Sequence, residues 1–313
     1  MADGGALDVG FLLRLNLFFP NHLLNEFARS PKSLTDVFKL NDGFSIPCVG
    51  FGTWQTPEGD VAVQAVTDAL AAGYRHIDTA FAYYNEKGVG QGIKESGIPR
   101  EEIFITTKLW NTERGYEKTL ASLPQSLKNL GVEYVDLYLI HWPANDKVYD
   151  NPVEVNVATW KAMEKLQKDG LVRSIGTSNF LGPHLEQILG VCDVKPAVDQ
   201  IEFHPGYPQF EAVKFCQERG IQVEAWSPLG CGRVLDDERL KALAAKYGKT
   251  VAQLCVRWAL QLDVLPLPKS TKAERIQSNA QVFDFEISEE DMKTINELPE
   301  FGYSTFSPYE LEF

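Results

Sequence analysis

The sequence lacks the patterns that mark several large classes of protein. Its five cysteines include no Cys-x-x-Cys pair, which argues against a zinc knuckle and a disulfide framework and favours a reducing compartment. No apolar run approaches the roughly 18 residues of a membrane-spanning helix. Basic residues are in deficit, with 30 Lys and Arg against 43 Asp and Glu, so the formal net charge is −13. Because nucleic acids and anionic membranes need a basic face, we expect no such partner. The reducing compartment that the cysteines favour predicts a cytoplasmic location.

Two nucleotide-binding fingerprints are incomplete. Segment 88–92, Gly-Val-Gly-Gln-Gly, has the spacing of the first glycines of a dinucleotide-binding loop, but Ile93 breaks the fingerprint and the glycines lie in a helical pattern. Segment 248–250, Gly-Lys-Thr, resembles the end of a phosphate-binding loop, yet Leu243 stands where its first glycine is needed. We interpret 248–250 as a helix stop followed by a Thr N-cap. An open doubly wound dinucleotide fold is therefore not favoured.

From Leu34 onward, short β-rich runs alternate with amphipathic stretches of helical length. Several of the strand candidates are almost continuously apolar, which is typical of parallel strands covered on both faces. The eight strand candidates are 48–52, 75–80, 103–108, 134–140, 172–176, 197–202, 221–226 and 264–268. Helix candidates between them include 61–72, 116–130, 155–168 and 211–219, with Gly73, Gly131, Gly170 and Gly220 at the expected stops.

Eight such units in about 250 residues, with no Pro- or Gly-rich linker between them, predict an α/β protein with a single (β/α)8 barrel. The barrel domain is predicted over residues 33–313, and residues 1–32 form an N-terminal extension of unknown role. The Asn-Asp-Gly turn at 41–43 predicts a hairpin over 38–45 that closes the bottom of the barrel.

Polar residues follow the predicted strands at their C-terminal ends, where barrels of this kind carry their chemistry. They are Asp78, Tyr83, Lys108, His141, Ser178, Asn179, Gln200, Trp226 and Lys269. Each residue alone has a structural explanation, such as a helix cap for Asp78 or a rim lysine for Lys108. Four ionisable side chains at one rim are harder to explain in this way, because charges are rarely buried unless paired. The sequence thus predicts an active site at this rim, without a metal ion.

Seven segments carry a resemblance to a known family. They are 50–54, 73–80, 107–110, 137–143, 176–180, 227–230 and 268–270, and in order and spacing they are similar to the signatures of the aldo-keto reductases. The resemblance runs from about Phe38 to Asp284 and is closest to short-tailed members of microbial or plant type. It implies an NADP-dependent oxidoreductase that reduces aldehydes or ketones to alcohols with NADPH, acts on a small carbonyl substrate and works as a monomer.

The resemblance also implies the roles of four residues. Tyr83 would protonate the carbonyl oxygen that hydride transfer leaves negatively charged. Lys108 would lower the phenol pKa, since a nearby cation favours phenolate, and Asp78 would keep Lys108 charged. His141 would hydrogen-bond the substrate oxygen and orient the carbonyl. Tyr84 is a competing phenol, but the family's spacing from the aspartate selects position 83.

The residues that would bind the cofactor form a larger set. They are Gly52, Thr53, Trp54, Asp78, Ser178, Asn179, Gln200, Trp226, Ser227, Leu229, Lys269, Ser270, Thr271, Arg275 and Asn279. By the resemblance, Ser178, Asn179 and Gln200 bind the nicotinamide carboxamide, and the segment from Lys269 to Asn279 binds the 2′-phosphate. A dianionic phosphate on an acidic protein needs such clustered cations. By the same resemblance, Trp226 stands at the position whose ring stacks on the nicotinamide, where most family members have Tyr.

Substrate-binding residues are expected to be Trp54, Tyr83, Trp110, His141 and Trp142, which would form an apolar, aromatic cleft for lipophilic or aromatic aldehydes. Two other functions stay open. The protein could be a non-catalytic NADP(H)-binding barrel, or a lyase of aldolase type that uses Lys108 as a Schiff-base amine. An ammonium paired with Asp78 is a poor nucleophile, which argues against the lyase.

Overall fold

The computed structural model describes residues 30–312, so nearly all of the extension predicted over 1–32 lies outside the described residues. Eight parallel strands form one sheet in which each strand pairs with its neighbour in the chain, from β3 to β10. The strands are β3 (Phe51–Gly52), β4 (His76–Asp78), β5 (Phe104–Leu109), β6 (Val135–Ile140), β7 (Val172–Ser178), β8 (Val198–Glu202), β9 (Gln222–Trp226) and β10 (Val264–Pro266).

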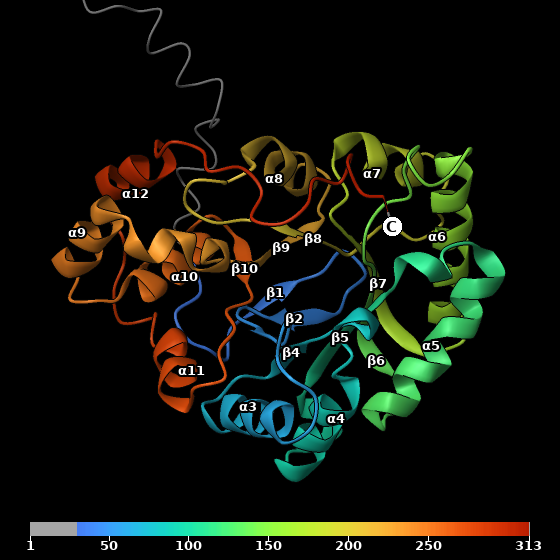
Figure 1. The fold of residues 1–313 in the computed structure, drawn as a ribbon, viewed down its shortest axis with the longest axis horizontal. Helices are drawn as coiled ribbons and strands as arrows, with labels where there is room; N and C mark the ends of the chain where they lie inside the picture. Colours follow the sequence, from blue (N-terminus) through green and yellow to red (C-terminus); the bar gives the residue numbers. More distant parts are fainter. Residues whose placement is uncertain (1–29, 313) are drawn as a thin grey trace, which may run out of the picture.

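Backbone hydrogen bonds join the two ends of this sheet. The N–H groups of Gly50 and Gly52 donate to the carbonyls of Pro266 and Pro268, each over 3.1 Å. The sheet therefore curls round on itself, with helices around its outside (Figure 1). The helices are α3 (Asp60–Ala71), α4 (Glu86–Glu95), α5 (Tyr116–Leu130), α6 (Pro152–Lys168), α7 (Gly182–Leu189), α8 (Phe210–Gln217), α9 (Glu238–Lys246), α10 (Val251–Gln261), α11 (Ala273–Ala280) and α12 (Glu289–Asn296). The predicted (β/α)8 fold is confirmed.

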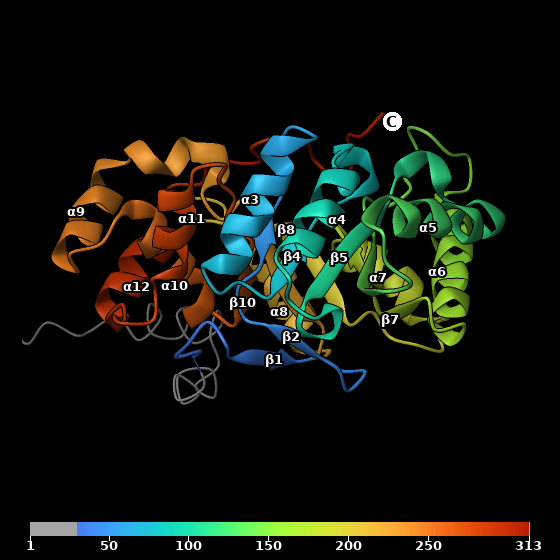
Figure 2. The ribbon, with the colours of Figure 1, turned by 90° about the horizontal axis from the view of Figure 1, so that it is seen from below.

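The predicted hairpin consists of β1 (Val37–Lys39) and β2 (Ser45–Pro47), which pair antiparallel. Figure 2 shows this hairpin lying across one end of the barrel. Leu40 and Ile46 are buried there against Leu137, Leu139 and other side chains of the barrel interior. Because these apolar groups are removed from water together, the hairpin seals the bottom and leaves the opposite rim for the site.

The end of strand β7 differs from the prediction. Strand β7 runs on through Ser178, two residues beyond the predicted end at Gly176, so Ser178 lies in the strand rather than after it. The extra residues are polar, but Thr177 Oγ1 donates to Asp199 Oδ1 and Ser178 Oγ donates to the carbonyl of Gln200. Cross-strand partners thus satisfy side chains that suggested a loop.

The three glycines of segment 88–92 are packing residues of α4, as their helical pattern suggested. A Cβ at Gly88 would lie 2.7 Å from the Ala62 side chain on α3, and one at Gly92 would lie 2.8 Å from the Val63 carbonyl. A Cβ at Gly90 would overlap the Leu130 backbone at the end of α5. Glycine therefore lets α4 approach both neighbouring helices closely.

We expect Gly90→Ala to destabilise the protein by about 1 to 3 kcal/mol or more, although alanine favours helices, because a backbone carbonyl cannot move aside for the new methyl group. Urea unfolding followed by circular dichroism measures this change. Lys94→Ala, at an exposed position of the same helix, is the matched control and should change stability by less than about 0.5 kcal/mol. Equal stability of the Gly90 variant and wild type would contradict the close approach.

Within residues 30–312 no helix combines the length and the apolar character needed to cross a bilayer. The same residues hold no group of three or more His, Cys, Asp and Glu side chains placed to bind a metal ion.

Candidate active site

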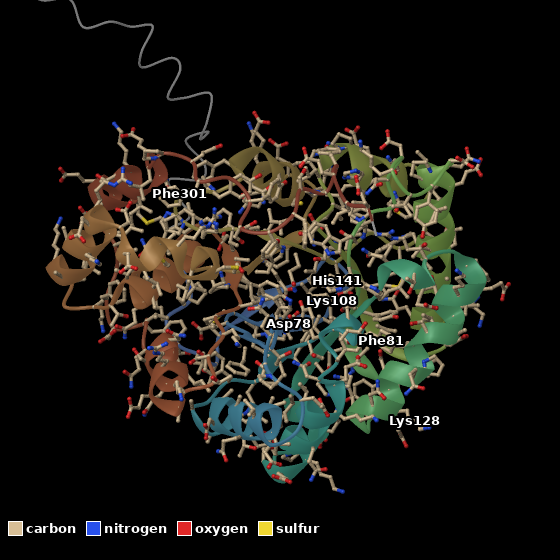
Figure 3. All side chains as sticks on the ribbon, viewed as in Figure 1. Asp78, Phe81, Lys108, Lys128, His141 and Phe301 are labelled. Carbon is tan, nitrogen blue, oxygen red and sulfur yellow. The ribbon has the colours of Figure 1, made fainter. Side chains whose placement is uncertain are left out.

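A cavity of about 800 Å³ opens at the C-terminal ends of the strands. It brings together nearly all of the site residues predicted from the sequence: Gly52, Trp54, Asp78, Tyr83, Trp110, His141, Trp142, Ser178, Asn179, Gln200, Trp226, Ser227, Leu229, Lys269, Ser270, Thr271, Arg275 and Asn279. Figure 3 shows Asp78, Lys108 and His141 close to one another near the centre of the barrel. Lys108 and Thr53 lie just behind the cavity wall: Lys108 is fully buried, and Thr53 Oγ1 donates to the Asp78 carbonyl over 2.9 Å.

Asp78, Lys108 and Tyr83 form a hydrogen-bonded line. Lys108 Nζ donates to both Asp78 oxygens, over 2.7 Å to Oδ1 and 2.9 Å to Oδ2, and to the Thr79 carbonyl over 2.9 Å. It also lies 3.3 Å from the Tyr83 hydroxyl oxygen. Asp78 ends β4 and Lys108 is the penultimate residue of β5, so adjacent parallel strands place the two charges together.

A short 3-10 helix, Phe81–Tyr83, follows β4 and carries Tyr83. The buried amide of Asn85 fixes this segment: its Nδ2 donates to the carbonyls of Thr53 and Thr56, and its Oδ1 accepts from Thr79 Oγ1. Sequence reasoning missed Asn85, which has no signature of its own. Its role becomes visible only when the loop after β3 is seen beside the loop after β4.

Burial raises the pKa of the Tyr83 phenol above its ordinary value. The Lys108 ammonium opposes this increase through its charge and its hydrogen bond, while the charge of Asp78 adds to it. The contribution of Lys108 thus has the direction expected from the sequence, and burial acts against it. The cost of burying a phenolate is larger than the attraction of the ammonium, so the net pKa is raised.

Lys108 keeps its proton in this environment. Burial lowers the pKa of the ammonium, but the charge of Asp78 and the contact with Tyr83 outweigh burial, so the net pKa is raised. Asp78 thus has the predicted relation to the lysine. A protonated lysine is not nucleophilic, which also weakens the case for Schiff-base chemistry.

His141 directly follows β6 and lies at the base of the cavity. Its ring packs edge-on against Tyr83 and Trp110, with centroids 5.6 and 5.2 Å apart. Burial lowers the pKa of the imidazole well below its ordinary value, and the charges of Lys108 and Arg114 lower it further. His141 is therefore a neutral imidazole near pH 7, able to donate one hydrogen bond. Sequence reasoning did not single out Arg114, which donates to the carbonyls of Trp142 and Pro143.

The residues expected to bind nicotinamide form a second hydrogen-bonded group. Asn179 Nδ2 donates to the carbonyl of His141 over 2.9 Å and to Ser178 Oγ over 3.1 Å. Trp226 Nε1 donates to Asn179 Oδ1 over 2.8 Å. That bond holds the half-buried indole at the cavity wall, where it presents an aromatic face. Gln200 Nε2 donates to Asp78 Oδ2, which links this group to the lysine pair.

Cations line the other end of the cavity. Lys269, Lys272 and Arg275 follow β10, among the hydroxyl groups of Ser270 and Thr271. Partial burial lowers the pKa of Lys269, and an anion beside it would reverse that shift. Amide donors at one end and clustered cations at the other fit a nicotinamide cofactor with a phosphorylated adenosine.

The C-terminal tail completes the aromatic wall of the cavity. Phe306 and Thr305 line it together with the three predicted tryptophans. The tail is held in place by Ser304, whose N–H donates to the buried Glu202 carboxylate over 2.9 Å, and by Phe301, whose N–H donates to the Gly206 carbonyl over 2.6 Å. Sequence reasoning did not place the tail, because these contacts join distant parts of the chain.

The sequence is similar to known proteins along most of its length. The model of the Aldo/keto reductase family matches residues 48–300. The chain is 51% identical over 268 residues to a protein named glyoxal reductase from Bacillus subtilis, a match covering 86% of this chain and 94% of the relative. It is 47% identical over 264 residues to 9,11-endoperoxide prostaglandin H2 reductase from Trypanosoma cruzi, covering 83% and 90%.

Solved structures are similar as well. An aldo-keto reductase from Bombyx mori, crystallised in complex with NADP, superimposes with a TM-score of 0.80 at 36% identity and covers 87% of this chain and 95% of its own. An aldo-keto reductase complexed with NADPH gives a TM-score of 0.81 at 34% identity, with coverage of 89% and 93%.

Proposed function

This chain belongs to the aldo/keto reductase family, and from that premise we propose that it reduces an aldehyde or ketone to an alcohol with Tyr83 as the proton donor. It is an NADP-dependent oxidoreductase, and related enzymes have been crystallised with NADP or NADPH. One observation carries the choice of residues: the line of hydrogen bonds from Asp78 through Lys108 to Tyr83 at the cavity wall.

When bound, NADPH supplies the hydride that converts the carbonyl carbon to an alcohol carbon. The residues of this chain then have to manage the negative charge that develops on the oxygen. Tyr83 is protonated near pH 7, because its pKa is raised, and it can give its hydroxyl proton to that oxygen. The phenolate left behind lies 3.3 Å from the Lys108 ammonium, which stabilises it.

Asp78 and His141 have supporting roles in this proposal. Asp78 holds Lys108 in its charged form and fixes the position of Nζ with two hydrogen bonds. His141 stays neutral and can donate a hydrogen bond to the carbonyl oxygen, which orients the substrate without competing for the proton. Because every one of these residues comes from a single chain, we propose that the monomer is a complete catalytic unit.

We propose a neutral, aromatic or lipophilic carbonyl compound as the substrate. Trp54, Trp110, Trp142 and Phe306 give the cavity an aromatic wall around Tyr83 and His141. The two relatives above carry the names of quite different substrates, so homology does not decide between them.

Consumption of NADPH with a panel of carbonyl compounds tests the function directly. The panel should include glyoxal, a benzaldehyde and a long-chain aldehyde, each with NADPH and with NADH. We expect turnover with NADPH that is fastest for aromatic aldehydes. Binding of NADPH without turnover on any carbonyl would favour the non-catalytic barrel, and borohydride trapping of a Lys108 adduct would favour the lyase.

We expect Arg275→Ala to weaken NADPH binding by roughly 1 to 3 kcal/mol and to leave NADH binding almost unchanged, because the guanidinium would contact only the 2′-phosphate. Fluorescence titration of wild type and variant with both cofactors measures the two affinities. Lys293→Ala, which removes an exposed cation of α12, is the control for net charge. An equal loss for NADPH and NADH would assign Arg275 a structural role.

A further inference from the structure

A second layer of polar side chains lies inside the barrel below the active site. His76 on β4, Thr106 on β5 and Glu224 on β9 are fully buried, and each stands two positions before a rim residue of its strand, so it points to the same side. Interior layers of such barrels consist mostly of branched apolar residues. The mechanism described above uses none of the three.

Glu224 is connected to the active site by an unbroken series of hydrogen bonds. Its Oε2 accepts from Gln200 Nε2 over 2.8 Å, and the same nitrogen donates to Asp78 Oδ2 over 2.8 Å. Asp78 Oδ2 in turn accepts from Lys108 Nζ over 2.9 Å, and that Nζ lies 3.3 Å from the Tyr83 hydroxyl. Register explains the first link, because Gln200 and Glu224 are paired residues of β8 and β9.

The other oxygen of Glu224 is poorly satisfied. Within the described residues Oε1 accepts no hydrogen bond, and the imidazole nitrogen nearest to it, His76 Nε2, is 3.8 Å away. That nitrogen is already engaged with Thr106 Oγ1 over 2.9 Å. A buried carboxyl group with one unpaired oxygen is costly to keep, so its retention calls for an explanation.

We propose that Glu224 is a positioning residue for carbonyl reduction, which holds the Gln200 amide against Asp78 and whose charge state changes how strongly Tyr83 holds its proton. This inference rests on the proposed function, since it assigns a source of pH dependence to the same site. Glu224 does not line the cavity and would touch neither substrate nor cofactor.

The groups that face Glu224 determine the sign of the effect. The pKa of its carboxyl group is raised to about 8: burial and the charge of Asp78 raise it, and Gln200 and Lys108 oppose them. Asp199 on β8 adds a smaller increase. His76 on β4 contributes no charge, because burial and Lys108 lower its pKa to about 3. Glu224 is therefore mostly protonated at pH 7 and gains a negative charge as pH rises.

A new negative charge beside the Asp78 and Lys108 pair makes phenolate less favourable at Tyr83, because like charges repel. Tyr83 then becomes a weaker acid. We expect kcat of the wild-type enzyme for reduction to fall severalfold between pH 7 and 9, with KM for the carbonyl almost constant. We call this fall in kcat between pH 7 and 9 the step. It is caused by ionisation of Glu224 and should be absent when the residue at position 224 cannot ionise.

Glu224→Gln tests this directly, since the amide keeps the shape and the acceptor oxygen for Gln200 but cannot ionise near pH 8. We expect its kcat to lie within about twofold of wild type at pH 6.5 and to lack the step between pH 7 and 9. Asp199→Asn is the matched control, because Asp199 is also buried and burial raises its pKa to about 7. The control should retain the step. A wild-type pH profile in Glu224→Gln, or loss of the step in Asp199→Asn instead, would overturn the proposal.

An infrared titration separates this inference from the proposed function. The protonated carboxyl band of Glu224, identified by its loss in Glu224→Gln, should disappear near pH 8 in wild type. In Asp78→Asn the same band should disappear at a lower pH, since the charge that opposes ionisation is gone. An unchanged titration in Asp78→Asn would refute the coupling even in a chain without activity. Absence of any carbonyl reduction, with the coupling intact, would instead refute the proposed function alone.

Discussion

Replacement of Tyr83 by phenylalanine is expected to lower kcat for carbonyl reduction by about 100-fold to 10,000-fold, the usual contribution of a general acid. The substitution removes a single oxygen atom, which lies 3.3 Å from Lys108 Nζ and which has no hydrogen bond that holds secondary structure together. The loss should therefore appear in kcat, because the hydroxyl acts in the transition state, and hardly in the affinity for NADPH.

The neighbouring phenol provides a matched control for this result. Tyr84 is 77% exposed and, unlike Tyr83, does not line the cavity. Tyr84→Phe should keep wild-type turnover. Steady-state rates of both variants, with NADPH titrations alongside, complete the comparison. More than about a tenth of wild-type turnover in Tyr83→Phe would move the acid role to Tyr84 or His141.

The strands could be predicted because runs of apolar residues in the sequence indicate which segments are buried. Segment 135–140 is almost wholly apolar, and the structure places it as a fully buried central strand, β6. Ends of strands were less predictable, since they depend on partners that are distant in sequence. Thr177 and Ser178 look like loop residues until Asp199 and the Gln200 carbonyl are seen across the sheet.

The candidate site was predictable for a related reason. Residues such as Asp78 and Lys108 end neighbouring parallel strands, and the barrel fold alone brings strand ends to one rim. Pattern reasoning could not foresee effects that depend on burial depth, such as the increase that burial causes in the pKa of Tyr83. Asn85, Glu224 and the tail around Phe306 were missed because only contacts across the fold reveal them.

Replacement of Lys108 by methionine is expected to be about as damaging to kcat as loss of the Tyr83 hydroxyl. Methionine has a similar length and fills the same buried space, but the phenolate left by proton transfer would lose its only adjacent cation among the described residues. Without that cation, burial and the charge of Asp78 act unopposed on Tyr83 and raise the phenol pKa further. Proton donation then becomes more difficult at every pH.

The same substitution should also destabilise the fold, by about 3 to 5 kcal/mol, because it leaves the buried Asp78 carboxylate without its ion pair. Stability and chemistry can be separated with the double variant Asp78→Asn, Lys108→Met, in which neither charge remains. We expect urea unfolding to show that the double variant regains most of the lost stability, while its kcat stays as low as that of Lys108→Met. Lys87→Met, at an exposed position of α4, controls for loss of a lysine charge elsewhere. Recovery of turnover together with stability would mean that Lys108 only supports the fold, and that the ammonium has no part in the proton transfer.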